Sequence, residues 1–128
     1  MQESGEMYLE TILILSQKMD KVRAINVAES MGFSKPSVSR ALTRLKNDFC
    51  ITLDDSNGIK LTPKGKCIAD KIYERHVVIS ELLMALGVDK ETALMDACKI
   101  EHDISDATFQ ALKDHSHSIV ETGFGERS

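Results

Sequence analysis

Three side chains of the kinds that bind transition metals stand close together in the later part of the sequence: Cys98, Glu101 and His102. They occupy positions i, i+3 and i+4, and residues three and four apart lie on one face of a helix. If the segment is helical, a thiolate, a carboxylate and an imidazole project together and supply most of a transition-metal site. The same spacing also suits a packed cysteine beside a solvated Glu–His pair, so the rest of the chain must decide.

The elements that would position these side chains are mostly helices. Gly32 and Gly87 are typical of helix C-termini, and Pro36 and Pro63 suit first helical turns. Asn57 followed by glycine favours a hairpin. The apolar spacing predicts helices over 6–18, 22–31, 36–48, 63–86, 90–102 and 105–115, with short strands over 50–53 and 59–61. We therefore expect a mainly α fold.

The second and third helices form a helix-turn-helix, and the hairpin after them is the wing of a winged helix. Four basic residues and no acidic one lie from Lys35 to Lys46. Hydroxyls and arginines on the exposed face suit hydrogen bonding to base edges and phosphates in a major groove, although a merely solvated basic helix has a similar composition. The predicted DNA contacts are Ser34, Lys35, Pro36, Ser37, Ser39, Arg40, Thr43, Arg44 and Lys60.

Basic and acidic residues are distributed unevenly along the chain. Residues 20–75 hold 11 basic and 7 acidic residues, whereas the remainder holds 5 basic and 13 acidic. Such asymmetry indicates a polyanion-facing part joined to an acidic part. We assign residues 1–72 to a winged helix-turn-helix DNA-binding domain. Residues 73–128 form an α-helical dimerisation and metal-binding domain, with a loose tail from about residue 116.

The long helix from Pro63 predicts a partner. Its second half, around residues 77–84, is so apolar that it must bury more than one face. A homodimer satisfies this requirement, and two-fold symmetric operator DNA favours dimers.

Composition indicates a cytoplasmic protein. The chain has 128 residues and contains no run of about 18 apolar residues of the kind that spans a membrane. A basic start followed by an apolar stretch, the mark of a secretory signal, is not seen, and we expect no membrane partner. Three widely spaced cysteines are typical of free thiols in reducing cytosol.

These pieces, in this order, resemble the diphtheria-toxin-repressor family of iron- and manganese-dependent transcriptional repressors, over about residues 4–115. Members of its iron branch usually carry a C-terminal domain resembling an SH3 fold, and this sequence ends too early for one, so we expect a short form. The motifs that carry the resemblance are Glu6-Met7-Tyr8-Leu9, Pro36-Ser37-Val38-Ser39, Leu61-Thr62-Pro63-Lys64-Gly65 and Cys98-x-x-Glu101-His102.

The resemblance implies a set of ligands for the primary metal. The iron branch uses a Met from the first helix with a Cys, a Glu and a His, which fall here on Met7, Cys98, Glu101 and His102. The manganese branch has carboxylates at the positions of Met7 and Cys98. Because soft sulfur ligands favour Fe(II), Co(II), Ni(II) or Zn(II) over Mn(II), we expect Fe(II), with the other four able to bind in vitro.

A second metal site is also implied. The ancillary site of the iron branch uses two His and a Glu; His76 matches the first His, but Ser80 and Leu94 replace the others. The manganese branch instead adds a Glu one turn after the first-helix ligand, together with the same His. These positions are Glu10 and His76, which could share Glu101 with the primary site.

The resemblance therefore implies an iron(II)-activated, DNA-binding repressor that controls metal-homeostasis genes as a homodimer on double-stranded operator DNA. One alternative is a manganese-responsive regulator of the same family. Another is a redox-sensing winged-helix regulator that uses the thiol of Cys98. A small metalloenzyme built on Cys98, Glu101 and His102 is a weaker alternative, because no general base is evident beyond the ligands and the basic helix-turn-helix would be unexplained. We expect no enzyme activity.

Overall fold

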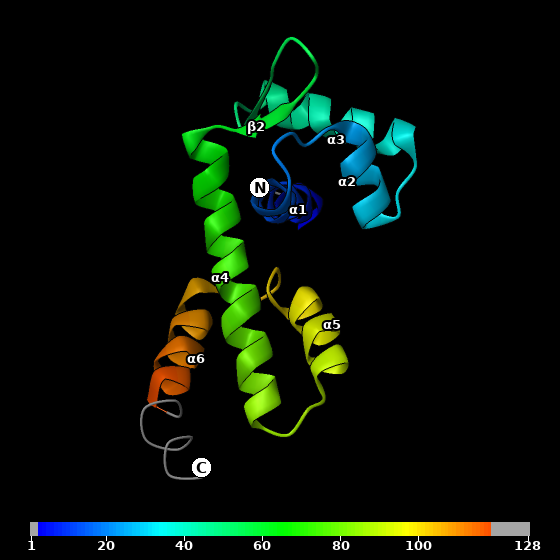
Figure 1. Ribbon diagram of the computed structural model, residues 1–128. Coiled ribbons are helices and arrows are strands. Elements are labelled where there is room, and N and C mark those ends of the chain that lie inside the picture. Colours follow the sequence, from blue (N-terminus) through cyan, green and yellow to red (C-terminus); the bar gives the residue numbers. More distant parts are fainter. Residues whose placement is uncertain (1–2, 119–128) are drawn as a thin grey trace. The chain divides into compact units, whose positions relative to one another are not determined.

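The computed structural model describes residues 3–118, which fold as two compact units, one ending at Lys71 and the other beginning at Ile72. The division falls within one long helix, α4 (Pro63–Ala85), which contributes to both units (Figure 1). Among the described residues, no helix combines the length and the apolar character needed to cross a membrane. The mainly α fold expected from the sequence is confirmed.

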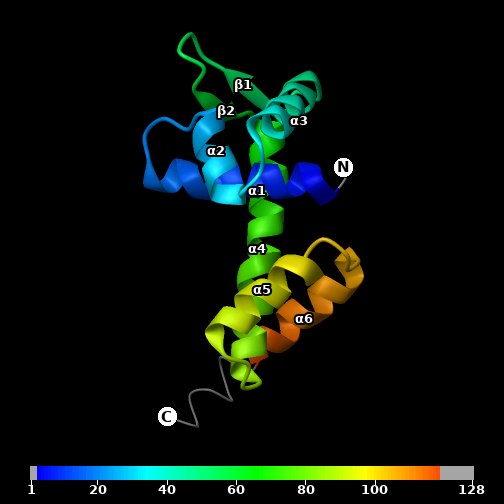
Figure 2. The ribbon, with the colours of Figure 1, turned by 90° about the vertical axis from the view of Figure 1, so that its right-hand side faces the viewer.

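The first unit contains three helices that pack on one another, α1 (Glu3–Lys18), α2 (Ala24–Met31) and α3 (Lys35–Asn47) (Figure 2). Gly32 ends α2 in a left-handed conformation (φ 71°), and its N–H donates to the carbonyl of Ala28 at 2.9 Å. The side chain of Ser34 then caps α3. The buried side chains of this unit include Leu9, Ile12, Leu13, Val27, Ala28, Val38, Leu42, Leu45 and Ile51.

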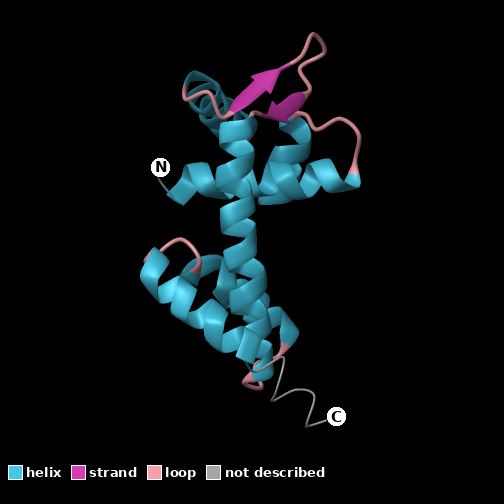
Figure 3. Cartoon of the chain, turned by 90° about the vertical axis from the view of Figure 1, so that its left-hand side faces the viewer, coloured by secondary structure: helices cyan, strands magenta, loops and turns pink. Residues whose placement is uncertain are grey.

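The wing is an antiparallel hairpin of β1 (Ile51–Leu53) and β2 (Ile59–Leu61), drawn in magenta in Figure 3. The loop between the strands is wider than a two-residue turn, and Asn57 adopts a left-handed conformation (φ 63°). One carboxylate oxygen of Asp54 accepts hydrogen bonds from the backbone N–H of Ser56 (2.9 Å) and of Gly58 (2.8 Å). The acidic residue at the wing tip is therefore used to shape the loop.

The wing is also tied to the segment before α2. Val22 pairs with Ile59 in a single β-bridge, which explains why α2 begins at Ala24 and not at the expected residue 22. The ammonium group of Lys21 lies 3.8 Å from a carboxylate oxygen of Asp54. Arg23 Nε donates to a backbone carbonyl of the loop at 3.3 Å. These contacts fix the acidic tip against its own domain.

The start of α4 packs against the segment that joins α3 to β1. Thr62 Oγ1 accepts from the N–H of Gly65 (3.1 Å) and so caps the helix, and the N–H of Thr62 donates to the carbonyl of Cys50 (3.0 Å). A Cβ atom on Gly65 would lie 2.0 Å from the same carbonyl oxygen. Only glycine permits this close approach of helix and strand.

The second unit consists of the later part of α4, α5 (Lys90–Ile100) and α6 (Asp106–Ser118). Asp89 caps α5, since its carboxylate accepts from the N–H of Thr92 at 3.0 Å. Two boundaries differ from the sequence prediction. Helix α5 ends at Ile100 and not at about residue 102. Helix α6 continues to Ser118, past the expected end at residue 115 and into the expected tail. The rest of that tail lies outside the described residues.

Candidate metal centre and nucleic-acid interface

Three metal-binding side chains meet in the second unit: His76 of α4, Cys98 of α5 and Glu101, which follows the last residue of α5. One potential ligand atom from each lies within 4.8 Å of the other two. His76 Nδ1 is 2.9 Å from Glu101 Oε2 and 3.9 Å from Cys98 Sγ. The carboxylate is buried, whereas the thiol is exposed. The cluster therefore has a buried side and a side open to solvent.

His102 adds a second imidazole on the other side of the same carboxylate. Its Nε2 lies 3.3 Å from Glu101 Oε1, so each oxygen of Glu101 faces one histidine ring. Oε1 is buried, and no described residue donates a well-formed hydrogen bond to it. A buried carboxylate oxygen without a strong partner is costly, and a cation would satisfy it. The chemistry of this oxygen fits a metal ligand.

The neighbours of His76 favour a proton on its imidazole ring. The hydrogen bond with Cys98, followed by that with Glu101, raises the pKa of His76 to about 10, although partial burial acts in the opposite direction. A metal ligand must be a neutral imidazole or a thiolate, so cation binding at these atoms would release protons.

The donor set and the spacing both suit a transition metal. Separations of 2.9 and 3.9 Å are compatible with two ligands that share an ion at bond lengths of about 2.0–2.3 Å. One nitrogen, one sulfur and one carboxylate oxygen suit Fe(II), Co(II), Ni(II) or Zn(II), because the thiolate is a soft ligand.

The structure regroups the residues that the sequence divided between two sites. His76, expected in a second site, lies beside Cys98 and Glu101. Glu101 caps the C-terminus of α5 in a helical conformation, and its N–H donates to the carbonyl of Ala97 at 3.0 Å, so it stays on the helical face that carries Cys98. Met7 and Glu10 lie on α1 in the first unit, and their part in metal binding stays a prediction.

One residue of the site escaped the sequence analysis. Arg75 is buried, and its guanidinium donates to the backbone carbonyl of Glu101 at 3.1 Å. A signal was present in the helical spacing. Arg75 lies three residues after Ile72 and four before Ile79, and both isoleucines are buried. A guanidinium on a buried helix face requires hydrogen-bond acceptors from elsewhere in the fold.

The predicted DNA-contact residues are mostly exposed on α3 and β2. Two of them also stabilise the helix start. Ser34 Oγ accepts from the N–H of Ser37 at 3.3 Å and donates to Ser37 Oγ at 2.9 Å, and Arg40 Nη2 lies 3.4 Å from the same Ser37 oxygen. The side chains of Lys35, Ser39, Arg40, Thr43, Arg44 and Lys60 are exposed to solvent.

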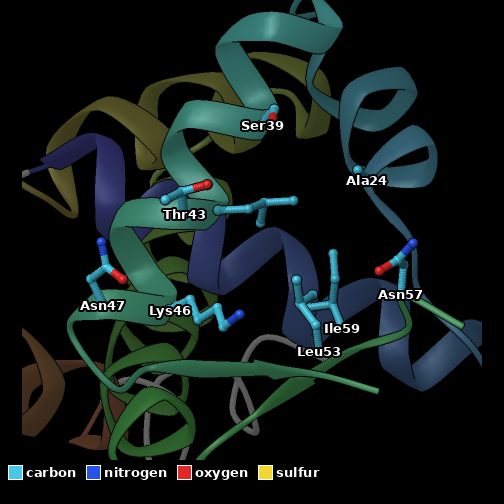
Figure 4. Close-up of a pocket in the computed structure, with 9 residues that line it drawn as sticks. Ala24, Ser39, Thr43, Lys46, Asn47, Leu53, Asn57 and Ile59 are labelled. Carbon is cyan, nitrogen blue, oxygen red and sulfur yellow. The ribbon is translucent and has the colours of Figure 1, made fainter. Parts of the chain in front are cut away.

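A hollow of about 330 Å³ separates α3 from the wing (Figure 4). Thr43, Lys46 and Asn47 line it from α3, as does Ser39. Apolar side chains, including that of Leu53, line the opposite wall together with Asn57. Sequence reasoning left Lys46, Asn47 and Asn57 out of the predicted contacts. A hollow with one polar, basic wall beside an exposed basic helix suits a nucleic-acid backbone.

Comparisons with known proteins agree with both parts of this description. Residues 1–49 match the iron dependent repressor N-terminal DNA binding domain, and residues 62–123 match the iron dependent repressor metal binding and dimerisation domain. The transcriptional regulator MntR of Escherichia coli O6:H1 is 33% identical over 106 residues, which are 83% of this chain and 68% of that protein. The HTH-type transcriptional regulator MntR of Geobacillus thermodenitrificans is 32% identical over 102 residues, 80% of this chain and 72% of that protein.

A solved structure gives the same result. The manganese regulator SloR superposes with a TM-score of 0.78 at 30% sequence identity over 87% of this chain, and the chain spans about half (52%) of its length. The two MntR relatives are regulators of transcription and not enzymes. The resemblance inferred from the sequence motifs is confirmed, and the chain belongs to the diphtheria-toxin-repressor family of metal-dependent transcriptional repressors.

Proposed function

We propose that this protein is a homodimeric cytoplasmic repressor that binds operator DNA when a divalent metal occupies the cluster of His76, Cys98 and Glu101, and that it controls metal-homeostasis genes. The observation that carries the proposal is the meeting of these three ligands in the second unit of a chain whose first unit is a winged helix. Exposed apolar side chains in the second unit, at Leu86 and Met95, support a dimer.

Fe(II) is the metal that the ligands favour. The sulfur atom of Cys98 lies 3.9 Å from His76 Nδ1, and a soft sulfur ligand discriminates against Mn(II). The relationship to the manganese regulator SloR, at 30% identity, favours Mn(II) instead. We give more weight to the ligand chemistry, because the metal binds the residues of this chain and not those of its relatives.

DNA recognition is assigned to α3 and the wing. Exposed Arg40, Thr43 and Arg44 suit base edges and phosphates, and Lys60 of β2 suits a phosphate. The acidic tip of the wing is engaged with the segment before α2 through Lys21 and Asp54. We therefore propose that the wing contributes its strand and not its tip.

The regulation is a linkage between two binding reactions. Metal promotes DNA binding only if it binds the DNA-competent arrangement more tightly than the others. Typical coupling is about 1–3 kcal/mol, or roughly 5–150-fold in DNA affinity. We propose that Met7 and Glu10 of α1, as ligands, provide this linkage, together with His102. Met7→Ala should then reduce the effect of metal on DNA affinity more than it reduces DNA affinity in chelator.

The decisive experiment is anaerobic binding to the DNA upstream of the protein's own gene, with Fe(II), Mn(II) or a chelator at one salt concentration, since salt alone changes such affinities strongly. We expect tight binding with metal only, and tighter binding with Fe(II). Cys98→Ala should lose the response, whereas Cys67→Ala, an exposed cysteine outside the cluster, should keep it. Equal binding with metal and with chelator would refute the proposal.

A thiol-based redox regulator is the second candidate, and one observation favours it. Cys98 is exposed and hydrogen-bonded to His76, a neighbour that can stabilise a thiolate. Peroxide would oxidise this thiolate to a sulfenic acid and would itself be reduced to water. If peroxide in metal-free buffer abolished DNA binding by the wild-type protein but not by Cys98→Ala, this candidate would replace the first.

A further inference from the structure

The turn that carries two of the predicted ligands follows the end of a helix. Helix α5 ends at Ile100, and Glu101 and His102 lie between it and Asp106, where α6 begins. Within the turn, the N–H of Asp103 donates to the carbonyl of Ile100 at 3.0 Å. Carbonyl groups at a helix C-terminus find no partner within the helix, so groups from elsewhere must hold them.

Arg75 of α4 supplies those groups. Its Nη1 donates to the carbonyls of Glu101 (3.1 Å) and Ile104 (2.8 Å), and its Nη2 pairs with the carboxylate of Asp106. The guanidinium carbon lies 5.3 Å from the centre of the Phe109 ring. One side chain therefore holds the beginning and the end of the turn and the first residue of α6.

The hydrogen bonds of Arg75 explain the conformation of the turn better than they explain the packing of the hydrophobic core. The side chain of Arg75 is only 8% exposed, and its Nε is buried without a hydrogen-bond acceptor among the described residues. Replacing a buried ion pair with apolar residues of similar size is often neutral or stabilising, so core packing alone does not explain an arginine here. The fork of the guanidinium does explain it, because a lysine ammonium cannot reproduce that planar set of donors.

We propose that Arg75 is a positioning residue of the metal centre. Its neighbour His76 contacts the carboxylate of Glu101 at 2.9 Å, while Arg75 itself holds the backbone carbonyl of Glu101. Helix α4 thus fixes Glu101 at two points, and cation binding requires less ordering of the turn. The inference rests on the proposed metal site, and residues that orient metal ligands in this way typically change metal affinity about 10–100-fold when substituted.

The test compares Arg75→Lys with Lys113→Ala in the full-length protein. Lys113 pairs with Glu74 at 2.8 Å, so its loss loosens the packing of α6 on α4 without touching the turn. Two quantities are measured: the affinity for Co(II), from its visible absorption, and amide hydrogen exchange of residues 101–106 in metal-free protein. Arg75→Lys should weaken Co(II) binding about 10–100-fold and speed exchange in the turn. Lys113→Ala should stay within about twofold of wild type in affinity.

Each other outcome has a defined meaning. Wild-type affinity for Co(II) in folded Arg75→Lys would overturn the inference and leave the proposed function intact. A wild-type protein that binds neither Co(II) nor Mn(II) would overturn both. If Arg75→Lys fails to fold, Asp106→Asn takes its place, because it removes the anionic partner of Arg75 and keeps the arginine. Unchanged affinity and exchange in Asp106→Asn would also overturn the inference.

Discussion

Gly65 offers a direct test of how α4 is attached to the DNA-binding unit. In an ordinary helix, replacing glycine with alanine is stabilising by about 1 kcal/mol. Here the new Cβ atom would lie 2.0 Å from the carbonyl oxygen of Cys50, whereas ordinary contacts begin at 3.4 Å. The start of α4 and the strand would have to separate by the difference, about 1.4 Å.

That separation breaks contacts that the structure shows. The N–H of Thr62 donates to the carbonyl of Cys50 at 3.0 Å, and Thr62 Oγ1 lies 2.6 Å from the carbonyl of Phe49. Overpacking costs about 1–3 kcal/mol, and each buried group that loses its partner costs about 1–3 kcal/mol more. With the carbonyl of Cys50 as the one buried group that loses its partner, and after subtraction of the helix-propensity gain, Gly65→Ala should lower the free energy of unfolding by about 1–5 kcal/mol.

Urea denaturation followed by circular dichroism measures this change. Cys67→Ala is the matched control, because Cys67 is exposed on the same helix and its loss should alter stability by no more than about 0.5 kcal/mol. Affinity for Co(II) should survive in folded Gly65→Ala, since the cluster lies in the other unit, while DNA affinity should fall. A Gly65→Ala protein as stable as wild type would refute the reasoning.

Three further results are expected. Cys98→Asp replaces a soft ligand with a hard one, so calorimetric titration should show the ratio of Fe(II) to Mn(II) affinity falling; an unchanged ratio would remove Cys98 from the ligand set. Arg44→Ala should reduce the salt slope of DNA binding by about 1 without changing metal affinity, as measured by fluorescence anisotropy at several salt concentrations. The hydrogen bond from the N–H of Gly58, more than that from Ser56, lowers the pKa of Asp54 from its ordinary value of 3.8. The ionised carboxylate therefore contributes stability above pH 3.8, and this stability is lost as the pH falls through the lowered pKa. Acid denaturation should show this loss of stability in the wild-type protein as the pH falls. Asp54→Asn has no carboxylate to protonate, so it should not show the loss over the same pH interval.

The sequence predicted the DNA-binding unit closely because the signals there are local. Gly32 and the cap at Ser34 place the turn between α2 and α3 within one residue of where the structure has it. Apolar spacing places the buried faces of the same helices. Helix α1 begins at Glu3, three residues before the expected start, and the later start of α2 comes from a non-local contact, the bridge between Val22 and Ile59.

The family resemblance indicated the residue types of the cluster and a Glu101 shared with His76, whereas the nearness of His76 to Cys98 was not predicted. The spacing of Cys98 and Glu101 identified them as candidate ligands, because it depends on one segment. The place of His76 beside them depends on how α4 packs on α5, over separations of 22 and 25 residues. A pattern within one helix holds no information about such packing, and His76 was identified only through the family resemblance, which implies a second site that could share Glu101.

The end of α5 is a second feature that depends on contacts distant in the sequence, and these contacts also position the carboxylate of Glu101. Helical spacing predicts that the helix continues through His102, whereas α5 ends at Ile100 with Glu101 as its C-cap. Arg75 donates a hydrogen bond to the carbonyl of Glu101 at this helix end. The two carboxylate oxygens of Glu101 face His76 and His102 separately. Helix α4, through Arg75 and His76, therefore determines where the carboxylate lies. It follows that metal affinity in this chain should respond to changes in α4 as strongly as to changes in the cysteine-containing helix that the sequence brings to attention first.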